Sequence, residues 1–125
     1  MSALIAVNGV AFAKQTRGAS VEVWPEPRYP ALAEWFGWEG YCLVRFAVDE
    51  EGHPYAVSPE CTQRIFCFDA KRAVTGVRFL PKLVDGVPTI RTNVVFPLEY
   101  AFEGSSYDAS TDRRPLEMCE EIAVA

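Results

Sequence analysis

The sequence lacks the features on which several enzyme classes and membrane-spanning proteins depend. No apolar run approaches the roughly 20 residues needed to cross a bilayer. There is a single histidine, His53, with no serine or cysteine nucleophile at a recognisable spacing, and no glycine-rich phosphate loop. The Cys-x-x-Cys spacing of many zinc sites is also missing. We therefore expect neither an enzyme nor a bound metal or cofactor.

Positive charge is also scarce and scattered. Twelve Lys and Arg stand against 17 Asp and Glu, which gives a net charge of -5. Nucleic-acid binding depends on clustered cations that neutralise phosphates, and attraction to an anionic membrane surface depends on the same clustering. We expect no nucleic-acid partner and no charge-driven membrane binding.

The chain does contain enough apolar material for one compact core. Half of its 125 residues are hydrophobic and 13% are aromatic, which suits one domain and leaves too little for a comfortable second one. Neither an internal repeat nor a low-complexity tract is present. We divide the chain into an N-terminal extension at 1–24, a domain at 25–103 and an acidic tail at 104–125.

The N-terminal extension allows three interpretations. Asn8-Gly9 is flanked by apolar residues, a pattern that favours a type I′ β-hairpin. Ala11-Phe12-Ala13 has the small-x-small form of a signal-peptide cleavage site, although no Lys or Arg precedes it. A targeting remnant and plain disorder therefore stay open beside the hairpin.

A proline and a cluster of aromatic residues predict a short first helix. Pro30 suits the first helical position, and glycines downstream can end the helix after Phe36. The predicted helix, residues 30–36, places Leu32 and Trp35 on one face together with Phe36.

Beyond this helix, apolar residues recur at every second position in some segments, as in a strand, and at every 3.6 residues in another, as in a helix. From Tyr41 a period of two predicts a strand, which a turn at 49–52 connects to a short return strand at 54–58 bracketed by prolines. Helical spacing at 66–77 predicts a second helix. Alternation over 92–102 predicts the longest strand.

This order of elements predicts an α+β fold, a three-stranded antiparallel sheet with two helices on one face. The residues that we expect to be mostly buried are Val44, Phe46, Val74, Val77, Phe79, Phe96, Leu98 and Tyr100.

An ordered set of short motifs runs through the same region. The motifs are Tyr29-Pro30, Glu39-Gly40, Val48-Asp49, Asp85-Gly86 with Pro88, and an aromatic ending at Phe102. With this set, residues 25–103 resemble the C-terminal domain of TonB-family energy transducers. Each motif alone is common, so the resemblance rests on their order.

The resemblance implies a periplasmic peptide-binding module in energy-coupled transport. In that family the last strand pairs with the TonB box, a short N-terminal segment of TonB-dependent outer-membrane transporters. Carried over by position, the peptide-binding residues are Thr89, Ile90, Arg91, Thr92, Asn93, Val94 and Val95. The sequence shows neither a membrane anchor nor a Pro-rich spacer. We therefore expect the soluble part of an inner-membrane-anchored protein, or a soluble relative that cannot transmit force.

The residues themselves also direct attention to a sheet edge. An exposed edge can capture an extended peptide by strand addition, and Pro97 confines the last strand to an edge or a bulge. One alternative is that the N-terminal hairpin or the C-terminal tail covers this edge. Another is self-association through the edge, as a homodimer or assembly module without a transport role.

Four cysteines bear on the compartment of the protein. Cys61 and Cys67 flank the start of the second predicted helix, and we predict a disulfide between them in an oxidising compartment. Cys42 lies in phase with the apolar residues of the first strand and is expected to be a core thiol. Cys119 lies in the tail.

Overall fold

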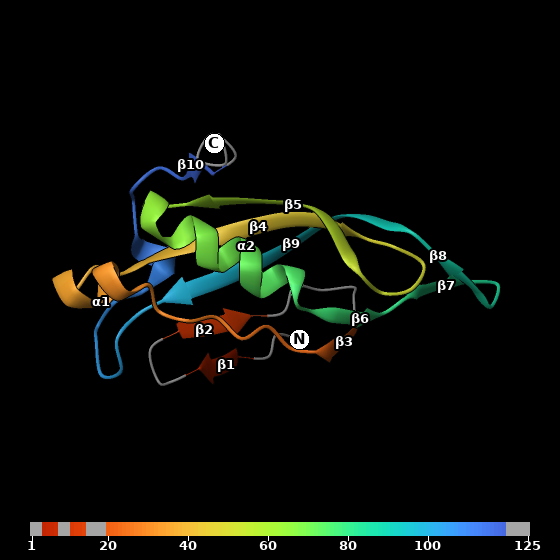
Figure 1. Ribbon diagram of the computed structural model, residues 1–125, viewed down its shortest axis with the longest axis horizontal. Coiled ribbons are helices and arrows are strands. Elements are labelled where there is room, and N and C mark those ends of the chain that lie inside the picture. Colours follow the sequence, from red (N-terminus) through yellow and green to blue (C-terminus); the bar gives the residue numbers. More distant parts are fainter. Residues whose placement is uncertain (1–3, 8–10, 15–19, 120–125) are drawn as a thin grey trace.

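A twisted antiparallel sheet with one helix along its face forms the body of the protein (Figure 1). The computed structural model spans the whole chain, and the structure is described for residues 4–7, 11–14 and 20–119. The main sheet has the strand order β1-β2-β9-β4-β5-β10. Its strands are β1 (Leu4–Val7), β2 (Ala11–Lys14), β9 (Arg91–Tyr100), β4 (Gly40–Val48), β5 (Pro54–Cys61) and β10 (Glu117–Met118).

Two strand pairs and two helices complete the described elements. Strand β3 (Ser20–Val23) pairs with β6 (Arg78–Leu80), and β7 (Lys82–Val84) pairs with β8 (Val87–Thr89). The α-helices are α1 (Ala31–Phe36) and α2 (Cys67–Thr75), and short 3-10 turns span η1 (Arg64–Phe66) and η2 (Ala109–Thr111).

The predicted α+β class is confirmed, and the predicted sheet is found at the centre as β5-β4-β9. The number of strands was wrong, because β2 joins the far side of β9 and β10 joins the far side of β5. Strands β1 and β2 pair antiparallel, with Val7 opposite Ala11. The Asn8-Gly9 turn proposed between them lies outside the described residues.

The return strand β5 is longer than predicted because Pro59 does not end it. Pro59 lies opposite Val44 in the β4–β5 ladder. The Pro59 carbonyl accepts a hydrogen bond from the Cys119 N–H on the side away from β4 (3.1 Å). A proline is tolerated at such a position because its missing N–H would have faced away from β4. The strand therefore continues to Cys61.

All the residues expected in the core are buried. Val44, Phe46, Val74, Val77, Phe79, Phe96, Leu98 and Tyr100 are each 3% exposed or less. Aromatic rings pack against one another within this core. The centroids of Phe66 and Tyr100 lie 4.6 Å apart in a stacked arrangement, and those of Phe46 and Phe79 lie 5.5 Å apart. The strand and helix periods in the sequence thus correctly identify which face of each element is buried in the core.

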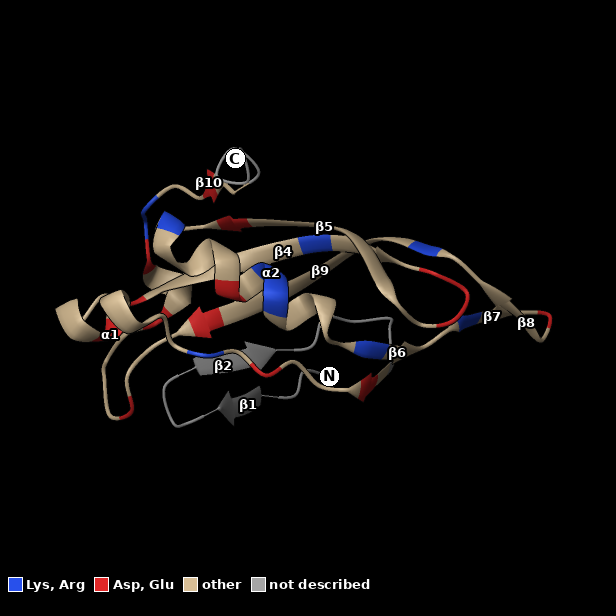
Figure 2. Cartoon of the chain, viewed as in Figure 1, with Lys and Arg blue, Asp and Glu red and all other residues tan. Residues whose placement is uncertain are grey.

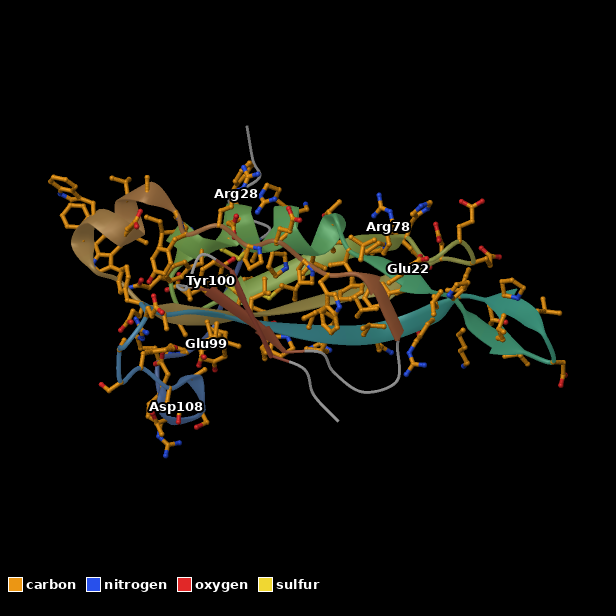
Figure 3. All side chains as sticks on the ribbon, turned by 90° about the horizontal axis from the view of Figure 1, so that it is seen from below. Glu22, Arg28, Arg78, Glu99, Tyr100 and Asp108 are labelled. Atoms are coloured by element: carbon orange, nitrogen blue, oxygen red, sulfur yellow. A yellow bond between two sulfur atoms is a disulfide. The ribbon has the colours of Figure 1, made fainter. Side chains whose placement is uncertain are left out.

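A buried carboxylate connects three elements inside this core. Asp69 of α2 accepts hydrogen bonds from the Arg28 backbone N–H (3.0 and 3.1 Å), the Tyr100 hydroxyl (2.6 Å) and the Arg72 guanidinium (2.8 Å). Figure 3 shows Arg28 on the helix side of the sheet, with Tyr100 below it. Burial, with the neighbouring Asp69 charge and hydrogen bond, raises the pKa of Tyr100 well above its ordinary value. The hydroxyl therefore remains a donor, and Asp69 ties the N-terminal segment to α2 and β9.

The first helix begins and ends close to the prediction but presents its apolar face to solvent. Pro30 is the N-cap residue, and Gly37 ends the helix with a φ of 72°, in the left-handed region that glycine adopts at low cost. Leu32, Trp35 and Phe36 are 62%, 83% and 58% exposed, whereas Ala33 is fully buried. One small side chain therefore anchors this helix.

The predicted disulfide between Cys61 and Cys67 was wrong. Cys61 is bonded to Cys42, and Cys67 is bonded to Cys119. The two bonds follow from the strand register. Cys42 and Cys61 are directly opposite each other in the β4–β5 ladder, and β10 brings Cys119 to the start of α2. Cys42 is buried as expected, but as half of a disulfide rather than as a thiol.

We expect the protein purified without reductant to show no titratable thiol after denaturation, and four after reduction. Peptide mapping of the unreduced protein should recover Cys42 linked to Cys61 and Cys67 linked to Cys119. A fragment linking Cys61 to Cys67 would contradict this pairing and restore the pattern predicted from the sequence.

The loop after β9 is anchored by a cluster around Asp112. The Asp112 carboxylate accepts hydrogen bonds from the Arg114 guanidinium (2.6 Å) and the Tyr107 hydroxyl (2.7 Å), and its side chain is 6% exposed. Arg114 also donates to the Glu39 carbonyl (2.7 Å), which joins the loop to the start of β4. The Arg114 hydrogen bond, helped by the one from Tyr107, holds the pKa of Asp112 well below its ordinary value of 3.8.

This cluster predicts a loop that detaches only in strong acid. A carboxylate with a depressed pKa stabilises the fold above its unfolded-state pKa and loses that contribution as the pH falls through the folded-state pKa. We therefore expect the Tyr107 ring resonances in NMR spectra to stay unchanged from pH 7 to about pH 4, and to approach those of a free tyrosine at lower pH. Asp112→Asn should show the released form at pH 7. A transition of the parent between pH 7 and 5 would contradict this assignment.

Candidate functional site

The candidate site is the part of β9 that faces away from β4. On one side β9 pairs with β4 over nearly its whole length, from Arg91 opposite Val48 to Tyr100 opposite Gly40. On the other side β2 pairs with Leu98–Tyr100. Within the described ranges no strand pairs with residues 91–97 on that side. The N-terminal strands thus cover one end of β9, and we call residues 91–97, which no described strand pairs with on this side, the open edge.

The backbone of β9 presents hydrogen-bonding groups to this open edge. Pro97 lies opposite Leu43, and a proline can stay in the ladder only where its missing N–H would face away from β4. Backbone groups alternate in direction along a strand. The Val95 N–H and C=O therefore also face away from β4.

A hydrogen bond on the other side of β4 supports the same alternation. The Tyr41 carbonyl accepts from the Thr62 N–H (3.0 Å), so the backbone of Tyr41 faces β5. Glu99, which lies opposite Tyr41, consequently faces away from β4, where it is opposite Phe12 of β2. Because Val95 and Glu99 are four residues apart, their backbone groups face the same side.

Two β-bulges, one in β9 and one in β5, interrupt the regular strand pairing with β4 near Phe46. Between the Phe46–Val94 and Val48–Arg91 pairs, β9 has one more residue than β4, and Asn93 adopts a φ of 57°. Strand β5 carries a matching irregularity with Ala56 at a φ of 52°. Asparagine tolerates the left-handed region better than most residues. A bulge bends its strand and locally increases the twist, so regular strand pairing on this edge is available at residues 94–97.

The edge alternates between buried and accessible side chains. Val94 and Phe96 point into the core at 5% and 1% exposure, while Val95 and Pro97 are half-buried on the opposite face. The loop after β9 stays at the other end of the strand, where Glu99 accepts from the Ala109 N–H (2.8 Å). Figure 3 shows Glu99 and Asp108 close together on the face of the sheet away from α2. The described loop is therefore anchored at Glu99 rather than at residues 91–97.

The residues proposed from the sequence do not all lie on this edge. Arg91, Thr92, Asn93, Val94 and Val95 belong to β9, whereas Thr89 ends β8 and pairs with Lys82, and Ile90 joins the two strands. Phe96 and Pro97 belong to the open edge but were not among the proposed residues. Pro97 was itself the signal, since its position in the ladder indicates which backbone groups face outward.

Charge is dispersed around the sheet. Figure 2 shows Lys and Arg on β4, α2, β6 and at the start of β7, interspersed with acidic residues in the turns. In the described chain this dispersal provides no basic stripe that could follow a phosphate backbone.

His53 lies in an exposed turn with acidic neighbours. Asp49 caps this turn by accepting from the backbone N–H groups of Glu51 (2.9 Å) and His53 (2.8 Å). The hydrogen bond from His53 makes the largest contribution to lowering the pKa of Asp49, and that from Glu51 adds to it. These contacts give Asp49 a structural role as a turn cap.

The fold and the open edge together define a class of small α+β domain in which a helix-backed antiparallel sheet leaves strand backbone available for pairing. The family described as Gram-negative bacterial TonB protein C-terminal matches residues 25–102, more than half of the chain, so the protein belongs to this family. It is a non-enzymatic, transport-associated family of the Gram-negative envelope whose members act in energy transduction and interact with outer-membrane transporters. No curated protein matches the chain. Within residues 4–7, 11–14 and 20–119, no helix has the length and apolar character to span a membrane.

Proposed function

We propose that the open edge of β9 captures the TonB box of an outer-membrane transporter as an added strand, and that this contact couples the transporter to an energised inner-membrane partner. The observation that carries the proposal is the side of β9 at residues 91–97 with which no strand of the described chain pairs. Strand addition takes most of its affinity from main-chain hydrogen bonds and its specificity from alternate side chains. The incoming segment would pair with Val95, and at Pro97 with the carbonyl alone.

The disulfides support a periplasmic location for this function. Two disulfides join all four cysteines, and such bonds form and persist in oxidising compartments such as the periplasm and are rare in the cytosol. A periplasmic domain lies where an outer-membrane transporter can offer an extended N-terminal segment. The proposed location and the proposed partner are therefore mutually consistent.

The test is a titration of synthetic TonB-box peptides against the parent and the Val95→Pro variant. Because the Val95 N–H faces the open edge, proline removes a donor to the peptide without removing one from the β4 ladder. An unmade buried hydrogen bond costs about 1 to 3 kcal/mol, so Kd should rise by about 5- to 150-fold. Calorimetry or fluorescence anisotropy measures the change.

Val95→Ala is the matched control, since it shortens the side chain and keeps the N–H. We expect its Kd to stay near that of the parent, and circular dichroism should show that both variants fold. Equal affinity of folded Val95→Pro and parent, or no binding of any TonB-box peptide to the parent, would contradict strand addition at this edge. A concentration-dependent dimer of the parent that Val95→Pro abolishes would instead support self-association through β9.

A further inference from the structure

The four cysteines converge on one buried cluster from four separate parts of the chain. Cys42 comes from β4, Cys61 from the end of β5, Cys67 from the first position of α2 and Cys119 from the residue after β10. All four are 6% exposed or less. The Sγ atoms of Cys61 and Cys119 belong to different disulfides and lie 3.8 Å apart. The sulfurs of Cys61, Cys67 and Cys119 all lie within 4.8 Å of one another.

This spacing matches the edge of a tetrahedral thiolate site. Zinc binds cysteine sulfur at about 2.3 Å, so two sulfurs at corners of the tetrahedron lie about 3.8 Å apart. The Cα atoms of the two bonded pairs are 4.0 and 5.7 Å apart. Three of the sulfurs lie within 4.8 Å of one another, and Cys42 lies directly opposite Cys61, so rotation of the reduced Cys42 side chain would supply the fourth.

The surroundings of the four cysteines are apolar, because all four belong to the buried hydrophobic core. The nearby Glu117 carboxylate is engaged with the Arg64 guanidinium at 3.3 Å and is half exposed, so it lies outside the buried cluster. Soft thiolates in an apolar, closed environment select zinc and similar metals over magnesium or calcium.

The geometry points to a second binding site in this protein: a zinc ion held by Cys42, Cys61, Cys67 and Cys119 when both disulfides are reduced. A thiol or phosphine reductant supplies two electrons to each disulfide, and with two protons from solvent each disulfide becomes two thiols. Zinc then binds the four sulfurs, and their protons return to solvent. An added small-molecule disulfide reverses the sequence by thiol–disulfide exchange, because two such molecules accept four electrons in total, restore the two protein disulfides and release the metal.

The missing Cys-x-x-Cys spacing is no obstacle to such a site. That spacing lets one short loop supply two ligands, whereas here the β4–β5 register and the attachment of β10 bring distant cysteines together. The ion would also replace the Cys67–Cys119 bond in holding Cys119 against α2. The C-terminal segment should therefore stay in place in the reduced, metal-bound protein.

The experiment uses the full chain, reduced with a phosphine, freed of reductant under anaerobic conditions and titrated with Co²⁺ alone. We expect the visible absorption bands of tetrahedral thiolate cobalt, which saturate at one ion per chain and are displaced by Zn²⁺. The unreduced protein should show none. Circular dichroism before and after addition of metal records the fold, and native mass spectrometry counts the bound ions.

Substitutions then distinguish the cysteine site from the group formed by Asp49, Glu51 and His53, whose side chains could also hold a metal ion. Replacing a residue that only supports a metal ligand typically lowers metal affinity by about 10- to 100-fold. Cys67→Ser and Cys119→Ser each remove a ligand itself, so each should weaken metal binding by more than about 100-fold. His53→Ala removes a ligand from the exposed Asp49, Glu51 and His53 group and should leave the bands unchanged. The proposal is overturned if the reduced parent shows no thiolate bands, if the bands persist unchanged in both serine variants, or if His53→Ala abolishes binding.

Discussion

Phe46→Ala is expected to lower the free energy of unfolding by about 3 to 5 kcal/mol, the usual cost of replacing a buried phenylalanine with alanine. Phe46 is 3% exposed, and its ring packs against Phe79 with centroids 5.5 Å apart. The substitution removes both the buried apolar surface and the ring contact, and leaves a cavity between β4 and β6. For a domain whose total stability is roughly 5 to 15 kcal/mol, this is a large share. Urea or guanidinium denaturation of the unreduced protein measures it.

Trp35→Ala is the matched control for this prediction. Trp35 is larger than Phe46 but 83% exposed, and surface substitutions usually change stability by less than about 0.5 kcal/mol. A parent-like midpoint for Phe46→Ala would show that the assigned β4 register is wrong. A loss in Trp35→Ala as large as in Phe46→Ala would show that α1 packs against something outside the described contacts.

Asp69→Ala is expected to cost about 2 to 6 kcal/mol. The substitution leaves the Tyr100 hydroxyl and the Arg28 backbone N–H without their acceptor, and each unsatisfied buried donor costs about 1 to 3 kcal/mol. Arg72 is 37% exposed at its side chain and can turn to solvent, so its loss adds little. Thermal or chemical denaturation measures the change.

A double-mutant cycle separates the Tyr100 contact from the rest of this network. Tyr100→Phe removes the hydroxyl and keeps the ring that stacks on Phe66, so Asp69→Ala should cost less in the Tyr100→Phe background than in the parent. The difference estimates the coupling energy, which for groups in one hydrogen-bond network is about 0.5 to 3 kcal/mol. Strictly additive losses would contradict a direct Asp69–Tyr100 hydrogen bond.

The elements that were predicted correctly depend on local chemistry. Alternation of apolar residues from Tyr41 and spacing at helical period from Phe66 marked the faces that become buried, because both periods follow from backbone geometry alone. Pro30 and Gly37 similarly bound α1, since one restricts φ at its start and the other takes a positive φ at its end. The exposure of Trp35 could not be inferred in this way, because a periodic apolar face does not indicate whether another element covers it.

The errors at β5 and at the cysteines share one cause. A strand that ends before Pro59 leaves Cys61 outside the ladder, and the nearest cysteine in sequence is then Cys67, the predicted partner. The bulge at Ala56 and the outward orientation of Pro59 let the strand continue and place Cys61 opposite Cys42. Strand register and bulges depend on packing between segments that are distant in the sequence, so no local sequence pattern indicates the Cys42–Cys61 bond.

The sequence by itself determined the α+β class, the buried residues of the core and the membership suggested by its ordered motifs, because propensity, period and turn chemistry act over a few residues. Only the tertiary structure decided which side of β9 is paired, where β2 covers it, and which sulfurs meet. Those features arise from contacts between segments far apart in the chain, whose energies depend on register and on the positions of neighbouring strands. The open edge at residues 91–97 and the cysteine cluster, on which both proposals rest, are of this second kind.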